Sequence, residues 1–169
     1  MNYLARLTNL IYFLSSTVIA SESHCNTQEQ IIFSCSIGTK VVSVCASKDL
    51  SATQGYVQYR FGVTSKPELL FPSSTQTIVP RTNIQARTLM FAGGGGAYLR
   101  FINGNYNYNY IVYSAIGQSW GAKDGIVVEK DRKIMVNLLC KEVPVSKLGE
   151  DFFSKAGLVI DNREFELPN

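Results

Sequence analysis

The chain has 169 residues, of which 46% are apolar and 17% are charged, and its formal net charge is +3. This composition is too apolar for a disordered chain, and the charge is too small to indicate a nucleic-acid-binding protein. One histidine, His24, and four cysteines are too few for a histidine-ligated metal centre or a disulfide-packed miniprotein. We therefore expect one globular domain that depends on its own hydrophobic core and uses no metal or other cofactor.

The first twenty residues have the pattern of a secretory signal peptide. Met1–Arg6 carries one positive side chain, Leu7–Ala20 is mostly apolar and uncharged, and Val18-Ile19-Ala20 suits signal peptidase. The apolar run is shorter than the roughly 20 residues of a membrane span. An N-terminal core helix or anchor is the alternative. We predict a signal peptide over residues 1–20 and a soluble periplasmic or secreted domain, without a membrane span, over residues 21–169.

Apolar and polar residues alternate along most of the remaining chain, which predicts β-strands. Short turn signals, such as Gly38-Thr39 and Asn103-Gly104, separate most of these strands. The predicted strands are Ile31–Ser36, Val41–Ala46, Gly55–Phe61, Pro67–Phe71, Ile84–Ala92, Ala97–Asn103, Tyr106–Ala115, Gly125–Lys130 and Ile134–Cys140.

One short helix is predicted after the strands, over Ser146–Ala156. Phe152 and Phe153 lie on its apolar side, and Gly157 is placed to cap its C-terminus. Eight or nine antiparallel strands with one C-terminal helix predict an all-β fold, either a small closed barrel or a sandwich. We favour the barrel because closure removes exposed strand edges.

All four cysteines lie beyond the predicted signal peptide, and an even number in an exported chain indicates two disulfides. In the first predicted hairpin, Cys35 lies on the better apolar face and Cys45 points the other way. These two cannot easily bond to each other, because a disulfide needs converging Cβ atoms. We predict a buried Cys35–Cys140 bridge and an outer Cys25–Cys45 bridge. Metal ligation is the rival interpretation, but the chain has no Cys-x-x-Cys pair.

Four consecutive glycines, Gly93–Gly96, join two predicted strands. A phosphate-binding loop needs Gly-Lys-Ser/Thr and a following helix, whereas Ala97-Tyr98 and a strand follow here. Either this run is a tight or flexible hairpin loop, or it contacts a ligand, since glycine allows close backbone approach and binding residues concentrate on loops. We take Gly94, Gly95 and Gly96 as candidate binding residues.

A tyrosine–asparagine repeat occupies residues 105–110. If the preceding Asn-Gly pair is a two-residue turn, Phe101 faces Tyr106 and the tyrosines lie on the apolar face. A three-residue turn would shift the pairing by one. With the two-residue turn, the opposite face pairs Arg100 with Asn107 and Tyr98 with Asn109. This polar ladder is a second candidate binding surface, and a ligand inside the barrel is a lesser alternative.

The single tryptophan, Trp120, lies in the glycine-rich segment Gly117–Gly125. Either it anchors a partner or it plugs the barrel mouth, and Lys123 beside it is a further binding candidate. The letters of a nucleophile elbow occur at Gly117–Gly121, but neither a helix nor a histidine follows. We therefore predict no catalytic residues, and we expect His24 to be a mobile residue near the mature N-terminus.

Basic side chains concentrate in the middle of the chain. Residues 50–123 carry six basic side chains and one acidic side chain, Glu68, whereas both flanking segments are mildly acidic. An acidic partner would be attracted to this middle region. The alternative interpretation is that these side chains lie on solvated strand faces.

Two resemblances to known families bear on function. The stretches Val42–Ser51, Gly55–Gly62 and Gly93–Phe101 resemble an uncharacterised family of small exported proteins of Gram-negative bacteria, over nearly the whole mature chain. That resemblance implies a periplasmic location. The segment Phe33–Val44 is similar to the opening of the periplasmic and membrane-bound inhibitors of C-type lysozyme.

The second resemblance implies an eight-stranded antiparallel barrel with a disulfide from the first strand to the C-terminal region, which matches Cys35–Cys140. The inhibitors' Ser-Gly-x-x-Tyr loop, which enters the lysozyme cleft, would fall on Gly94–Tyr98. Here Gly94 stands at the serine position. Trp120 and Lys123 loosely match a second inhibitor loop.

These observations predict a periplasmic binding or inhibitor-like protein that recognises a protein partner, such as a cell-wall hydrolase or a delivered toxin. One alternative is a binder of peptidoglycan or another anionic envelope component through the polar ladder. A further alternative is a hydrolase whose site would gather Ser119 or Glu68, Asp124 and Glu129 near His24.

Overall fold

The computed structural model describes residues 22–74 and 80–168, so the predicted signal peptide lies outside the described residues. The described chain is all-β apart from one short α-helix and one short 3-10 helix, η1 (Pro80–Thr82). All nine expected strands are present: β1 (Glu29–Ile37), β2 (Lys40–Ser47), β3 (Val57–Val63), β4 (Lys66–Phe71), β5 (Ile84–Phe91), β6 (Gly94–Asn103), β7 (Tyr108–Gly117), β8 (Gly121–Lys130) and β9 (Lys133–Leu139). Two short strands, β10 (Val145–Ser146) and β11 (Val159–Ile160), were not predicted.

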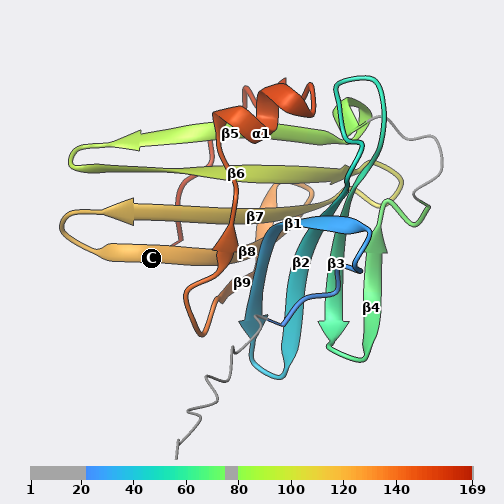
Figure 1. Cartoon of the computed structure of the whole chain (residues 1–169). Helices are drawn as coiled ribbons and strands as arrows, with labels where there is room; N and C mark the ends of the chain where they lie inside the picture. The colour runs from blue at the N-terminus through green and yellow to red at the C-terminus, as the bar shows by residue number, and fades with distance from the viewer. Residues whose placement is uncertain (1–21, 75–79, 169) are drawn as a thin grey trace, which may run out of the picture.

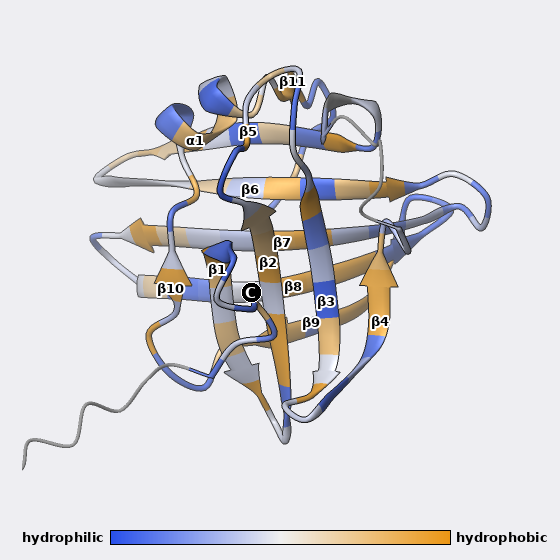
Figure 2. Ribbon diagram, turned by 45° about the vertical axis from the view of Figure 1, so that its right-hand side comes forward, coloured by the Kyte–Doolittle hydropathy of each residue, from blue (hydrophilic) through white to orange (hydrophobic). Residues whose placement is uncertain are grey.

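Of the two expected architectures, the structure has the sandwich. Within residues 22–74 and 80–168 the strands form two separate sheets, in the orders β10-β1-β2-β3-β4 and β11-β5-β6-β7-β8-β9. Strands of one sheet run across those of the other (Figure 1), and apolar residues recur along the crossing strands of both (Figure 2). Neighbouring strands are antiparallel except β11 and β5, which are parallel. Each sheet of the described chain therefore retains two edges.

The core lies between the two sheets. Phe33 and Val44 from the first sheet belong to the same buried cluster as Leu99 and Phe101 from the second. Tyr59 of β3 stacks on Tyr110 of β7, with ring centroids 5.2 Å apart. Strand alternation explains this packing, because every second side chain of a strand points to the same face.

The hairpin between β5 and β6 corrects one expectation. The turn is only Ala92-Gly93, in which Gly93 has φ +74°, and Phe91 already pairs with Gly94. Gly94, Gly95 and Gly96 are therefore part of strand β6 and not of a loop. Glycine is required at the turn for its positive φ, but the next three glycines need another explanation.

The hairpin between β6 and β7 has a different register from the expected one. Phe101 pairs with Tyr110 and not with Tyr106, because the turn spans residues 104–107 and Asn107 adopts φ +55°. Tyr106 consequently lies at the exposed tip, where 70% of its surface is accessible. The register differs by an even number of residues, so Tyr108 and Tyr110 still face the core as expected.

Both predicted disulfides are confirmed. Cys35 of β1 is bonded to Cys140, just after β9, so this bridge joins the two sheets. Cys25 is bonded to Cys45 of β2, which ties the N-terminal segment to the first sheet. Disulfides persist in oxidising compartments, so two of them are typical of a non-cytoplasmic protein.

The helix α1 (Glu150–Lys155) is shorter than predicted, since Ser146 belongs to β10. Phe152 and Phe153 are buried, as expected from their apolar side. The Gly157 cap is confirmed: Gly157 has φ +61° and its N–H donates to the Ser154 carbonyl at 3.1 Å. Across residues 22–74 and 80–168, no helix is long and apolar enough to cross a membrane.

Candidate functional site

The residues predicted to bind a partner do not form one surface. Gly95 and Gly96 of β6 line a cleft that Gly94 does not line, whereas Tyr98, Arg100 and Asn109 are buried on the other face of the same sheet. The remaining candidates lie at turns, Asn107 in the β6–β7 turn and Trp120 and Lys123 near the β7–β8 turn.

The cleft has a volume of about 540 Å³ and lies between the glycine-rich end of the second sheet and residues 143–149, which follow β9. β6, β7 and β8 supply most of its floor, and β5 contributes Thr88. Its lining residues are Thr88, Gly95, Gly96, Ala97, Ser114, Ala115, Ile116, Ala122, Asp124, Val143, Pro144, Ser146, Leu148 and Gly149.

Two glycines in this stretch of β6 are required by close packing against β7, and a third, Gly95, leaves the floor of the cleft open. A Cβ atom on Gly96 would lie 2.6 Å from the Ser114 carbonyl oxygen, and one on Gly94 would lie 2.1 Å from that of Ile116. β6 and β7 therefore approach so closely here that no side chain fits at either position. Gly95 lies on the same face as Ala97, two residues along the strand, and contributes no side chain to the cleft.

Among the described residues that line the cleft, Asp124 alone is charged. It is partly buried and accepts a hydrogen bond of 2.5 Å from Ser114 Oγ, its partner on β7. Burial raises the pKa of Asp124, and the Ser114 hydrogen bond offsets only part of this shift. A carboxylate in these surroundings gains from a cationic partner, because the attraction to that partner offsets the penalty that burial places on its charge.

The cleft has an apolar rim. Ile116 is 63% exposed and Val143 is 91% exposed, and they lie on different segments that line the cleft. Exposed large apolar side chains that group around a polar side chain are typical of protein-binding sites. The cleft thus combines a floor of small residues, one carboxylate and an apolar margin.

The expected polar ladder is not an exposed surface. Arg100 is fully buried, where its Nη1 donates to Glu129 Oε2 at 2.7 Å and its Nε donates to Asp161 Oδ2 at 2.5 Å. The Tyr98 hydroxyl, also buried, donates to the same Asp161 oxygen at 3.0 Å. Arg100 pairs across the sheet with Ile111 and not with Asn107. These side chains therefore hold the fold together and are not accessible to a partner.

The C-terminal segment after β11 covers this ladder, and the sequence interpretation missed it. Phe165 packs on Tyr98, with ring centroids 4.7 Å apart, and Leu167 joins the same apolar cluster. The apolar residues at 165 and 167 alternate with Glu164 and Glu166, a pattern that could have indicated an extended segment on a sheet.

Glu129 accepts three hydrogen bonds in this network. It accepts hydrogen bonds from Arg100, from Asn109 Nδ2 at 3.1 Å and from Arg163 Nη2 at 2.9 Å. Burial raises the pKa of Glu129, but these hydrogen bonds and the charge of Arg100 more than offset it, and the net pKa is lowered. Glu129 therefore stabilises the folded state when ionised.

We expect acid to weaken this network. Because the folded pKa of Glu129 lies below its ordinary value of 4.5, its contribution is fully present above that value and is lost as the pH falls through the folded pKa. Urea unfolding measured from pH 6 to about pH 3 should show a falling free energy of unfolding. The fall should be smaller in Glu129→Gln, and an equal fall in both proteins would contradict the role given to Glu129.

Trp120 lies near the β7–β8 turn. Its ring packs edge-on against Phe91, with centroids 5.7 Å apart, and the Lys123 ammonium lies 5.5 Å from its centroid. Lys123 Nζ also donates to the Pro168 carbonyl at 3.0 Å. Trp120 and Lys123 are thus held by the β5–β6 hairpin and the C-terminal segment, at the end of the sheet where the glycines lie.

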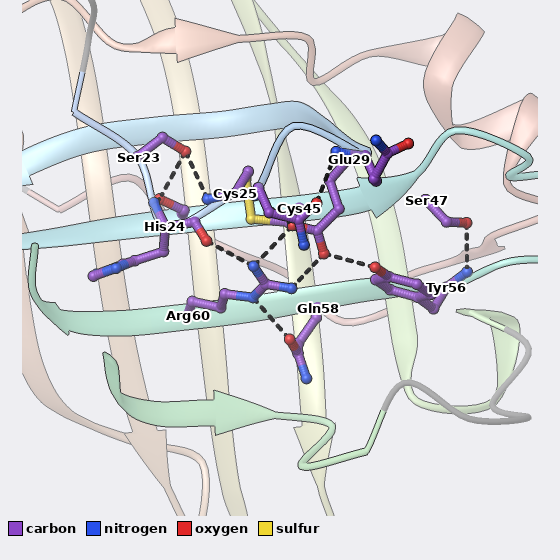
Figure 3. A network of polar contacts seen from close by, with 12 residues as sticks. Ser23, His24, Cys25, Glu29, Cys45, Ser47, Tyr56, Gln58 and Arg60 are labelled. Atoms are coloured by element: carbon purple, nitrogen blue, oxygen red, sulfur yellow. Dashed lines mark hydrogen bonds and ion pairs between the residues drawn. A yellow bond between two sulfur atoms is a disulfide. The ribbon is translucent and has the colours of Figure 1, made fainter. Parts of the chain in front are cut away.

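A polar network on the first sheet corrects the expectation that His24 is mobile (Figure 3). His24 Nε2 lies 3.1 Å from the Val41 carbonyl oxygen, and the His24 backbone carbonyl accepts from Arg60 Nη1 at 2.6 Å. Arg60 also pairs with Glu29, whose carboxylate accepts a hydrogen bond of 2.7 Å from the Tyr56 hydroxyl. This network holds the N-terminal segment on the sheet.

The same network contains one group of possible metal ligands in the described chain, Cys25, Glu29 and Cys45. The two sulfur atoms are bonded to each other, so neither is a thiolate that could bind a metal. Burial raises the pKa of Glu29, but its hydrogen bonds with Arg60 and Tyr56 more than offset this and lower it. The cluster therefore has a structural role, because it attaches the N-terminal segment to the first sheet.

The groups named for a hydrolase have separate partners. Glu68 pairs with Lys40 at 2.6 Å on the first sheet, and Glu129 belongs to the buried Arg100 network. Asp124 lies in the cleft with Ser114, whereas Ser119 is in the β7–β8 turn. The structure does not gather these side chains around His24.

No protein-family model matches the chain, and neither curated proteins nor solved structures gave a match. What the cleft can bind therefore follows from its shape, its carboxylate and its exposed rim.

Proposed function

We propose that the chain is a periplasmic binding protein whose cleft accepts a loop of a protein partner, with a lysine or arginine of that loop paired to Asp124. The observation that carries the proposal is a single carboxylate in a cleft floored by glycine and alanine. Small floor residues leave room for a long side chain, and the carboxylate at the floor supplies its counter-charge.

The environment of Asp124 favours this pairing. The Ser114 hydroxyl donates a hydrogen bond to Asp124 Oδ1, and no other side chain of the described residues donates to this carboxylate. The carboxylate can therefore accept further hydrogen bonds from a partner. The exposed apolar rim would contact the aliphatic stem of the lysine or arginine and the loop around it. A central charge surrounded by apolar contacts is a common arrangement for an interface anchor.

The class of partner is a cell-wall hydrolase or a delivered toxin, met in the periplasm. Two disulfides and the predicted signal peptide support an exported protein. The resemblance to lysozyme inhibitors supports a protein partner, but the contact is placed in the cleft because Tyr98 and Arg100 are buried. No described feature favours glycan binding through the polar ladder, whose central residue, Arg100, is fully buried.

Asp124→Asn should reduce partner binding at least tenfold, because the amide keeps the shape of the side chain and removes its charge. The same change should leave thermal stability equal or raise it. Burial raises the pKa of Asp124, so above that pKa the ionised carboxylate costs stability that asparagine does not cost. Binding is measured by capture of envelope proteins on the immobilised protein, quantified by mass spectrometry, and stability by thermal unfolding.

A matched pair of tryptophan variants tests the location. Ala122→Trp places a large side chain in the cleft from an exposed position, whereas Thr53→Trp places one on an exposed turn of the first sheet. Ala122→Trp should lose the proteins that the unchanged chain and Thr53→Trp retain. If Ala122→Trp and Asp124→Asn both retain the same proteins at the same level, the cleft is not the binding site.

A further inference from the structure

The outer edge of β5 is only partly covered. β11 pairs with Gln85 and Ala86 and then ends, and the Asp161 N–H donates to the Ala86 carbonyl at 2.9 Å. In an antiparallel sheet the backbone groups of alternate residues point to the same side. Ala86 points to the outer edge, so Thr88 and Met90 do as well. Within residues 22–74 and 80–168, no strand pairs with this part of the edge.

A groove runs along this open edge. It has a volume of about 820 Å³ and is bounded by α1 on one side and the C-terminal segment on the other. Phe153 and Leu158 line one wall and Phe165 the other, while Leu89 of β5 completes the apolar lining. The groove therefore offers unpaired backbone groups next to apolar walls, the combination that binds an added strand.

The charge of the groove is negative. Glu150 on α1 and Glu164 and Glu166 on the C-terminal segment all line it and are exposed. Arg87 is the one basic residue among the described lining residues, and its Nη1 donates to the Asp161 carbonyl at 3.3 Å. Carboxylates on both walls attract a cationic segment and repel an acidic one.

Little on this stretch blocks strand addition. Proteins commonly protect a sheet edge with a lysine, a proline, a bulge or a covering loop. Residues 87–91 contain one charged side chain, Arg87, and no proline, and they pair with β6 without a register shift. Met90 is 92% exposed, which leaves an apolar side chain beside its edge-facing backbone groups.

We propose that the β5 edge binds an extended, lysine- or arginine-bearing segment of another polypeptide as an additional strand. The backbone of the segment pairs with Thr88 and Met90. Alternate side chains of the segment enter the apolar groove, and its cationic side chains reach the carboxylates of Glu150, Glu164 and Glu166. This surface is distinct from the cleft of the proposed function and does not depend on it, although Thr88 borders both.

The probe is a fluorescent eight-residue peptide that alternates lysine and valine, with blocked ends, measured by fluorescence anisotropy with the full mature chain. Thr88→Pro should weaken its binding at least tenfold, because proline removes an edge-facing N–H while leaving the β5–β6 ladder intact. Thr88→Val keeps that N–H and should bind within threefold of the unchanged protein. Circular dichroism and thermal unfolding verify that both variants fold.

Four further arms decide between mechanisms, and in one of them glutamate replaces lysine in the peptide, which should then bind at least tenfold more weakly. Glu164→Lys combined with Glu166→Lys should weaken binding at least tenfold, and the same peptide N-methylated at alternate residues should not bind. Ala122→Trp, in the cleft, should leave the affinity unchanged. The proposal is overturned if the lysine–valine peptide does not bind, if Thr88→Pro or N-methylation has no effect, if a glutamate–valine peptide binds equally well, or if Ala122→Trp abolishes binding.

Discussion

Replacing Arg100 with methionine should lower the free energy of unfolding by about 3–5 kcal/mol. The Arg100 side chain is fully buried and pairs with Glu129 and Asp161, of which Asp161 is also fully buried. Without Arg100, two carboxylates remain in a buried site and one of their main counter-charges is gone. Removal of one partner of a buried pair is costly for this reason, even where the whole pair contributes little.

Urea unfolding followed by circular dichroism measures the change, and Arg87→Met is the matched control. Arg87 is exposed and makes one long hydrogen bond to the Asp161 carbonyl, so its replacement should cost less than about 1 kcal/mol. Equal losses in the two variants would show that the buried ion pairs do not form. The Arg100 variant should also release the C-terminal segment, which limited proteolysis would detect.

Removing the Cys35–Cys140 bridge should have the second large effect. The two cysteines are 105 residues apart, and in the chain-entropy model a loop of that length contributes about 4–5 kcal/mol. The bridge also ties β1 of the first sheet to the end of β9 in the second. Without the bridge, the segments that form β1 and β9 are no longer held together in the unfolded chain, whose conformational entropy therefore rises. The variant Cys35→Ala with Cys140→Ala, unfolded in urea, measures the effect.

The other bridge is the control. Cys25 and Cys45 are 20 residues apart, for which the same model gives about 3 kcal/mol. Cys25→Ala with Cys45→Ala should therefore be the more stable of the two double variants, by about 1–2 kcal/mol. If the order is reversed, loop length does not control the stabilisation, and the tie that Cys25 provides for the N-terminal segment contributes more than the long bridge.

Several features followed from the sequence because they depend on local alternation. The nine strands and the two disulfide pairings required only that every second side chain face the same way. The β6–β7 hairpin shows how robust this is: the register differs from the expected one, yet Tyr110 still faces the core because the shift is even. Gly157 likewise caps α1 as its position predicted.

The predictions of an exposed polar ladder and of a glycine loop were wrong, for two different reasons. The sequence alone could not show that residues 161–168 would cover the outer face of β6, since that contact joins Arg100 to Asp161 across 61 positions. The glycine run was expected to be a loop joining two strands, because glycine admits positive φ, and its excess over the needs of a turn suggested a contact role. In the structure, Gly94 and Gly96 instead allow β6 and β7 to approach each other.

The amino-acid sequence by itself therefore determined the nine longer strands, the face on which most of their side chains lie and the cysteine pairing, all of which are local or follow from parity. Only the tertiary structure decided which surfaces are open. Asp124 and Ser114 line one cleft because β7 and β8 pair at that point and residues 143–149 pass beside them. The β5 edge is open because β11 ends after two residues. Exposure depends on which distant segments cover a face, and no local pattern specifies that.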